Sequence, residues 1–104
     1  MKIERSERAG VRIVDVDGEV DMDSSPTLWA ELQKDLATRR PLRVRLASVR
    51  YIDSSGIAIL VQAHKQAHRG GVDFALESPS SQVLAVLQLA QLAKLFRIED
   101  APLR

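Results

Sequence analysis

The chain has 104 residues, of which 45% are apolar, and its 15 basic and 14 acidic residues leave a formal net charge of +1. This length supports one core, so we expect residues 1–104 to form a single domain. The balanced charge, with one Trp, one Tyr and two Phe, argues against a nucleic-acid surface, and the absence of cysteine excludes disulfides, zinc thiolate sites and a cysteine nucleophile.

The first half of the chain predicts a hairpin and a helix. β-branched residues over 11–16 favour a strand, and a short strand before it would turn at Ala9-Gly10. Gly18-Glu19-Val20-Asp21 follows as a polar loop or an extension of the strand. Apolar residues at helical spacing then predict a helix that begins near Ser24-Ser25-Pro26 and ends at Arg39-Arg40-Pro41.

The second half predicts alternating strands and helices. Apolar residues alternate with arginines over 42–46, which indicates a strand with one buried face. A helix begins near Ser54 and stops at Gly70-Gly71, and residues 72–76 alternate again as a strand. A third helix follows the turn at 78–81. The remaining predictions are a short helix between Leu89 and Leu95, a last short strand or extended segment over 95–98 and a tail over 100–104.

This order predicts an α/β fold with a mainly parallel sheet of four to five strands, flanked by three to four helices. The initial hairpin makes the sheet mixed. The charged N-terminal residues do not resemble a signal peptide, and no stretch approaches the roughly 20 apolar residues that span a bilayer. We therefore expect a cytoplasmic protein that does not insert into a membrane.

The turn Asp53-Ser54-Ser55-Gly56 is the most informative segment, because it places two hydroxyls at a helix N-terminus after a strand. A phosphate on Ser55 would meet unpaired N–H groups and the positive end of the helix dipole. It would add a charge of about −1.5 to −2 to the surface, enough to change binding to a partner. Helix capping by Asp and Ser is the simpler interpretation of the same residues.

Other chemistry is poorly supported. His64 and His68 have the i,i+4 spacing of metal ligands, but no third ligand is evident. The chain contains neither a Gly-x-Ser-x-Gly elbow nor a phosphate-binding loop. The histidines lie further along the helix than the serines, so no base is expected beside Ser55. The sequence therefore predicts neither an enzyme nor a cofactor.

A second polar segment could join the serine turn. Asp21 and Asp23 follow a strand end, and strands that are neighbours in a parallel sheet bring such ends together. An acid there could orient the Ser55 hydroxyl or help to position a metal-bound nucleotide carried by a partner. A solvated loop is the simpler alternative.

Taken in order, these segments resemble the STAS domain, and more narrowly the bacterial anti-sigma factor antagonists. The resemblance covers nearly the whole chain, and its most specific element is the turn Ile52-Asp53-Ser54-Ser55-Gly56. The other segments that carry it are Gly18-Glu19-Val20-Asp21, Gly70-Gly71, Ser78-Pro79-Ser80-Ser81 and Leu92-Ala93-Lys94-Leu95-Phe96.

The resemblance implies a phospho-switchable binding module in bacterial transcription regulation. Such an antagonist sequesters an anti-sigma factor that is also a serine kinase, the kinase phosphorylates one serine, and a phosphatase restores it. By motif position that serine is Ser55, and Asp21 matches an acidic residue near it. The resemblance places the partner-binding surface at Asp21, Asp53, Ser54, Ser55, Gly56 and Ile57.

One residue departs from the family pattern, and two other functions stay open. Arg45 stands where an aspartate is usual, which would weaken phosphorylation if that acid positions the site or its kinase. The arginine could instead pair with a phosphate. Some STAS proteins resemble the cytoplasmic subunit of a phospholipid-transporting ABC system, where the partner is a permease. Others resemble scaffold subunits of stress-signalling complexes.

Overall fold

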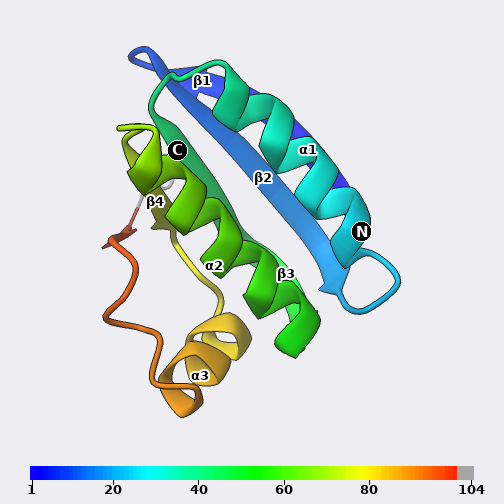
Figure 1. The fold of residues 1–104 in the computed structure, drawn as a ribbon. Helices are drawn as coiled ribbons and strands as arrows, with labels where there is room; N and C mark the ends of the chain where they lie inside the picture. Colours follow the sequence, from blue (N-terminus) through cyan, green and yellow to red (C-terminus); the bar gives the residue numbers. More distant parts are fainter. Residues whose placement is uncertain (101–104) are drawn as a thin grey trace.

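The computed structural model describes residues 1–100, in which five strands and three helices alternate after an initial hairpin (Figure 1). The elements are β1 (Lys2–Arg8), β2 (Val11–Val20), α1 (Ser25–Ala37), β3 (Leu42–Ile52), α2 (Ser54–Arg69), β4 (Phe74–Glu77), α3 (Ser81–Leu89) and β5 (Ile98–Glu99). Apart from Asp100, the predicted tail lies outside the described residues.

The sheet has the strand order β1-β2-β3-β4-β5, in which β1 is antiparallel to β2 and every other pair is parallel. This confirms the predicted mixed sheet. Right-handed crossovers between adjacent parallel strands all place their helices on the same face. Figure 1 shows α1 and α2 side by side over one face of the sheet. The opposite face, which we call the open face, carries charged side chains that include Asp15, Arg43, Arg45 and Glu77.

The core lies between the sheet and the helices. It contains the inward-facing residues of β2, β3 and β4 together with Leu28, Leu32 and Leu60 from the helices, all of them buried. Trp29 packs at the edge of this core. Apolar and charged residues alternate along β3, which explains why one face of the sheet is apolar. The leucines and valines of β3 face the helices, while Arg43 and Arg45 face the other way.

Helix α2 follows its sequence signals closely. Asp53 caps its start, and its end at Arg69 is followed by Gly70 and by Gly71 with φ of +68°. The N–H of Val72 donates to the carbonyl of Ala67 at 2.8 Å, which closes the last turn in the usual glycine-terminated way.

The predicted helix between Leu89 and Leu95 is absent. Helix α3 ends at Leu89, and the backbone then turns through Gln91 with φ of +59°. The N–H of Leu92 donates to the carbonyl of Leu87 at 2.8 Å. The same left-handed turn that ends α2 thus ends α3 with a non-glycine residue, and the apolar run beyond it packs without helical structure.

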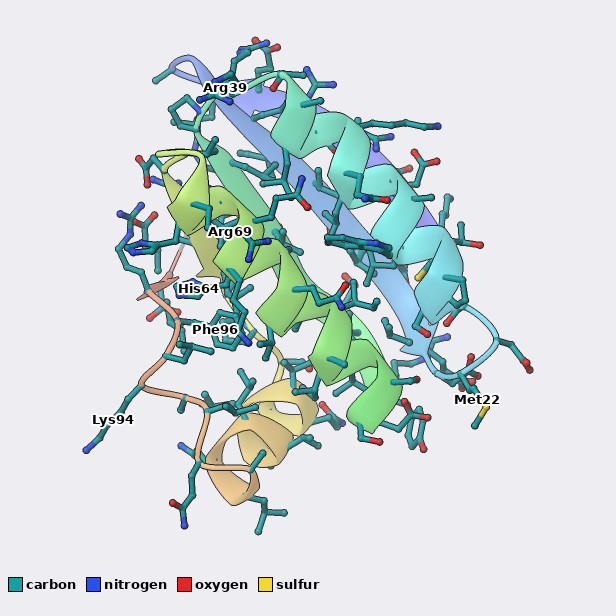
Figure 2. The ribbon with its side chains drawn as sticks, in the orientation of Figure 1. Met22, Arg39, His64, Arg69, Lys94 and Phe96 are labelled. Carbon is teal, nitrogen blue, oxygen red and sulfur yellow. The ribbon has the colours of Figure 1, made fainter. Side chains whose placement is uncertain are left out.

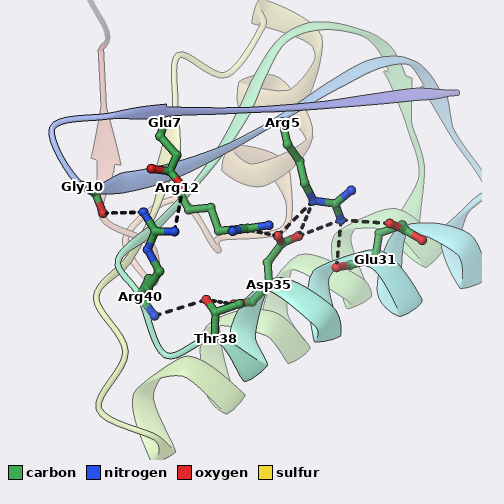
Figure 3. A network of polar contacts seen from close by, with 8 residues as sticks. All are labelled: Arg5, Glu7, Gly10, Arg12, Glu31, Asp35, Thr38 and Arg40. Atoms are coloured by element: carbon green, nitrogen blue, oxygen red, sulfur yellow. Dashed lines mark hydrogen bonds and ion pairs between the residues drawn. The ribbon is translucent and has the colours of Figure 1, made fainter.

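A buried carboxylate anchors the hairpin to α1 (Figure 3). Asp35 of α1 is 1% exposed, and it accepts hydrogen bonds from Arg5 of β1 and Arg12 of β2, with nearest N–O distances of 2.9 and 2.8 Å. Arg5 also reaches the Glu31 carboxylate at 2.9 Å. Sequence analysis missed this cluster. Its signal was Asp35 itself, an acid that directly precedes Leu36 in a helix with an apolar face.

Candidate functional site

Asp53 builds the start of α2. Its backbone is extended, with φ of −112° and ψ of −171°, and its Oδ1 accepts the N–H groups of Ser55 and Gly56 at 3.0 and 3.4 Å. This is the geometry of an N-cap, which satisfies donors that the first helical turn leaves unpaired. The capping interpretation of Asp53 is therefore correct, and it fixes the orientation of the serines that follow.

The two serines differ in their surroundings. Ser54 is exposed, whereas Ser55 is partly buried and its Oγ donates a hydrogen bond to Oδ1 of Asp53. The same carboxylate oxygen thus holds both the backbone and the hydroxyl of Ser55. A phosphate on Ser55 would lose that hydrogen bond and would compete with Asp53 for the helix N–H groups. The turn is consequently sensitive to modification at this hydroxyl.

Gly56 and Ile57 face inward, beneath the part of the turn that reaches the surface. Ile57 is 5% exposed and belongs to the core. A Cβ added to Gly56 would lie 2.7 Å from side-chain atoms of both Val20 and Ile52. Glycine at this position therefore lets α2 approach the strand ends, and it does not open the backbone to another molecule. Of the turn, Asp53, Ser54 and Ser55 reach the surface.

The Asp21 loop and the serine turn meet at the carboxyl edge of the parallel strands. The N–H of Asp53 donates to the carbonyl of Val20 at 3.2 Å, so the segments after β2 and β3 start side by side. The Asp21 carboxylate accepts the N–H groups of Ser24 and Asp23, each at 3.0 Å. The donating N–H of Ser24 is the main reason why the pKa of Asp21 lies below its ordinary value. Asp21 thus orders its own loop at this edge.

Met22 is a surface residue of this edge that sequence analysis missed. Its side chain is 76% exposed, and Figure 2 shows it at the tip of the loop between β2 and α1. A single exposed apolar side chain is common on protein surfaces. Met22 is a candidate contact residue because its loop starts beside the serine turn. The signal was an apolar residue between two aspartates, outside any helical or strand pattern.

Arg45 does not reach the serine turn. Its guanidinium lies 3.3 Å from the Glu77 carboxylate and 3.3 Å from Oγ of Ser78, and 3.9 Å from the Asp15 carboxylate. At about 3.3 Å per residue, the strand from Arg45 to Ile52 spans roughly 23 Å. At this distance Arg45 does not contact Ser55 or a phosphate on it, and an effect of Arg45 on the kinase stays a prediction. The arginine instead neutralises Glu77, which is 1% exposed on the open face.

Of the two histidines of α2, His64 is partly buried and packs against aromatic rings, whereas His68 is exposed. The ring of His64 meets Phe96 edge-on at 5.5 Å between centroids, and Figure 2 shows the two side chains next to each other. His64 lies nine residues after Ser55, which is about 14 Å along the helix. Within residues 1–100 no group of three or more His, Cys, Asp or Glu side chains could hold a metal ion.

In the described part of the chain, none of the helices is both long enough and apolar enough to cross a membrane. The fold and the site together define a small α/β domain that presents a serine at a capped helix start, beside an acidic loop. The chain belongs to the STAS domain family, whose model matches residues 2–102.

The comparisons with individual proteins agree with this family. The chain is 28% identical to the anti-sigma-B factor antagonist of Bacillus subtilis over 85 residues, which are 82% of this chain and 78% of that protein. The crystal structure of an anti-sigma factor antagonist from Mycobacterium paratuberculosis superposes with a TM-score of 0.85 at 24% identity, over 94% of this chain and 84% of the other. The phosphorylated form of the Bacillus cell fate determinant SpoIIAA gives a TM-score of 0.74 at 15% identity, over 97% and 92%.

Proposed function

We propose that this protein is an anti-sigma factor antagonist, a non-enzymatic module that binds an anti-sigma factor with serine kinase activity and is released when Ser55 is phosphorylated. The observation that carries this proposal is the Ser55 hydroxyl, held by the Asp53 cap at the surface of a helix start. The proposal is also supported by the curated relative described as an anti-sigma-B factor antagonist and by the fold relative solved in a phosphorylated form.

The binding surface in this proposal comprises Asp21, Met22, Asp53, Ser54 and Ser55. It combines an exposed apolar side chain with two carboxylates and two hydroxyls. An apolar anchor with a polar rim is the usual composition of a protein interface. Gly56 and Ile57 support this surface from beneath.

Phosphorylation would act on this surface in two ways. It would add a charge of about −1.5 to −2 next to the Asp53 carboxylate, which repels it. It would also take the Ser55 hydroxyl away from Asp53 and offer the helix N–H groups a stronger acceptor. A partner surface that complements the unmodified turn would meet excess negative charge and a rearranged cap, and would dissociate.

The test is a binding titration with the anti-sigma factor kinase of the same organism. We expect Ser55→Glu and Met22→Asp to weaken binding at least tenfold. The matched control is Gln62→Glu, which adds the same charge at an exposed position further along α2 and should bind normally. Circular dichroism of each variant verifies the fold. Equal binding by Ser55→Glu and the unmodified protein would contradict the proposal, and co-purification with an ABC permease in place of the kinase would favour the transporter function.

A further inference from the structure

Strand β1 is an unpaired edge of the sheet. In the described residues its strand partner is β2, and its other side carries a row of backbone N–H and C=O groups with no neighbouring strand. All seven residues of Lys2–Arg8 are exposed except Ile3, which is partly buried. An edge of this length is a template for another strand unless its side chains prevent pairing.

The charges of β1 have an unusual order. In Glu4-Arg5-Ser6-Glu7-Arg8, reading the segment backwards exchanges every acid with a base and leaves Ser6 in the centre. When two copies pair antiparallel about Ser6, Glu4 faces Arg8 of the other copy and Arg5 faces Glu7. Opposite charges directly across a strand pair stabilise it. The edge is therefore complementary to itself.

The same charges distinguish this register from the others. When a two-fold axis relates two identical antiparallel strands, residues that lie opposite each other must point to the same face of the sheet. The axis therefore passes between the two copies of one residue. Centring on Arg5 places Arg5 against Arg5 and Lys2 against Arg8. Centring on Glu4 or on Glu7 places like acids together. Centring on Ile3 pairs only Lys2 with Glu4, whereas the register about Ser6 gives an opposite charge to each of Glu4, Arg5, Glu7 and Arg8 in both copies.

The internal ion pairs of these side chains leave atoms for a second copy. Arg5 uses Nε and Nη2 on Asp35 and Glu31, and Glu7 uses Oε2 on Arg40. Arg8 uses Nη2 on Glu77. Among the described residues, Nη1 of Arg5, Oε1 of Glu7 and Nη1 of Arg8 have no hydrogen-bond partner. Figure 3 shows Arg5 and Glu7 side by side on the helix side of β1, already held in position by these contacts.

We propose that β1 is a homodimerisation edge: two copies of this chain pair antiparallel through β1 about Ser6 and form one continuous ten-stranded sheet. The serine turn follows β3, which β2 separates from β1, so the dimer presents two Ser55 turns. This inference does not depend on the proposed function, because it rests on the edge strand and its charges.

Sedimentation velocity over a range of protein concentrations tests the association. We expect a concentration-dependent dimer that weakens in high salt, and a dissociation constant that rises roughly tenfold or more in Glu4→Lys, which places a lysine opposite each Arg8. Glu19→Lys makes the same change in net charge at an exposed position on β2 and should leave the dimer intact. A protein that stays monomeric at millimolar concentration, or a dimer that Glu4→Lys does not affect, would overturn the proposal.

Cysteine pairing tests the register, because the chain has no cysteine of its own. Ser6→Cys places two thiols opposite each other across the two-fold axis, close enough for a disulfide. Glu4→Cys, the control on the same face of β1, places its thiols about 13 Å apart along the strands. We expect disulfide-linked dimers to form at least tenfold faster for Ser6→Cys in a glutathione buffer. Equal rates would contradict the register.

Discussion

Replacement of Gly56 by alanine tests how closely the start of α2 packs against the ends of β2 and β3. In an unhindered helix this change stabilises by up to about 1 kcal/mol, because alanine has the higher helix propensity. Here the new Cβ would lie 2.7 Å from Cγ1 of both Val20 and Ile52, and 3.1 Å from Cδ1 of Ile52. These atoms belong to buried residues of β2 and β3 that cannot move into solvent.

Overpacking of this kind costs about 1–3 kcal/mol, which outweighs the propensity gain. We therefore expect Gly56→Ala to lower the free energy of unfolding by about 1–2 kcal/mol, measured by urea denaturation with an unchanged m-value. Ala58→Gly is the matched control, since Ala58 is exposed in the same helix and loses only propensity. If Gly56→Ala is more stable than the unmodified protein, the proposed close packing of α2 against the strand ends is wrong.

Three further predictions concern stability. Asp35→Ala should cost about 2–3 kcal/mol in urea denaturation, because it leaves two half-exposed arginines without their buried partner; a loss below 0.5 kcal/mol would show that the anchor is unimportant. Gln91→Gly should raise the Tm by roughly 3–5 °C, since it relieves a left-handed backbone, while Gln88→Gly inside α3 should lower it. The pKa of Asp21 is depressed on folding, so its stabilising contribution is present above its unfolded pKa and is lost as the pH falls through its folded pKa. Below about pH 4, Asp21→Asn should therefore show a shallower loss of stability in acid, and an unchanged acid limb would contradict this.

Local signals located the helices of this fold well. The bounds of α2 follow from Asp53 at its start and Gly70-Gly71 at its end, which act within a few residues. The sequence analysis did not predict the carboxyl half of β3. The pairing of β3 with β2 shifts register twice, at Asp15–Asp17 and at Gly18–Glu19, and these shifts break the period-two pattern of apolar residues. Bulges of this kind depend on the neighbouring strand and leave no simple sequence signal.

The site was predictable in position and less so in detail. The order of strands was enough to bring Asp21 and Ser55 to the same edge. The inward orientation of Gly56 and Ile57 depends on how closely α2 packs on the strand ends, which no local pattern encodes. The partner of Arg45 lies 32 residues later in the chain, so its neutralising role could only emerge from the sheet register.

Phosphate incorporation at Ser55 is the most direct test of the proposed switch. The unmodified protein, Ser54→Ala and Ser55→Ala are each incubated with the anti-sigma factor kinase and ATP, and the product is mapped by mass spectrometry. The account predicts one phosphate on Ser55 in the first two proteins, none in Ser55→Ala, and release of the modified protein from the kinase. Incorporation that persists in Ser55→Ala, or a phosphorylated protein that stays bound, would contradict it.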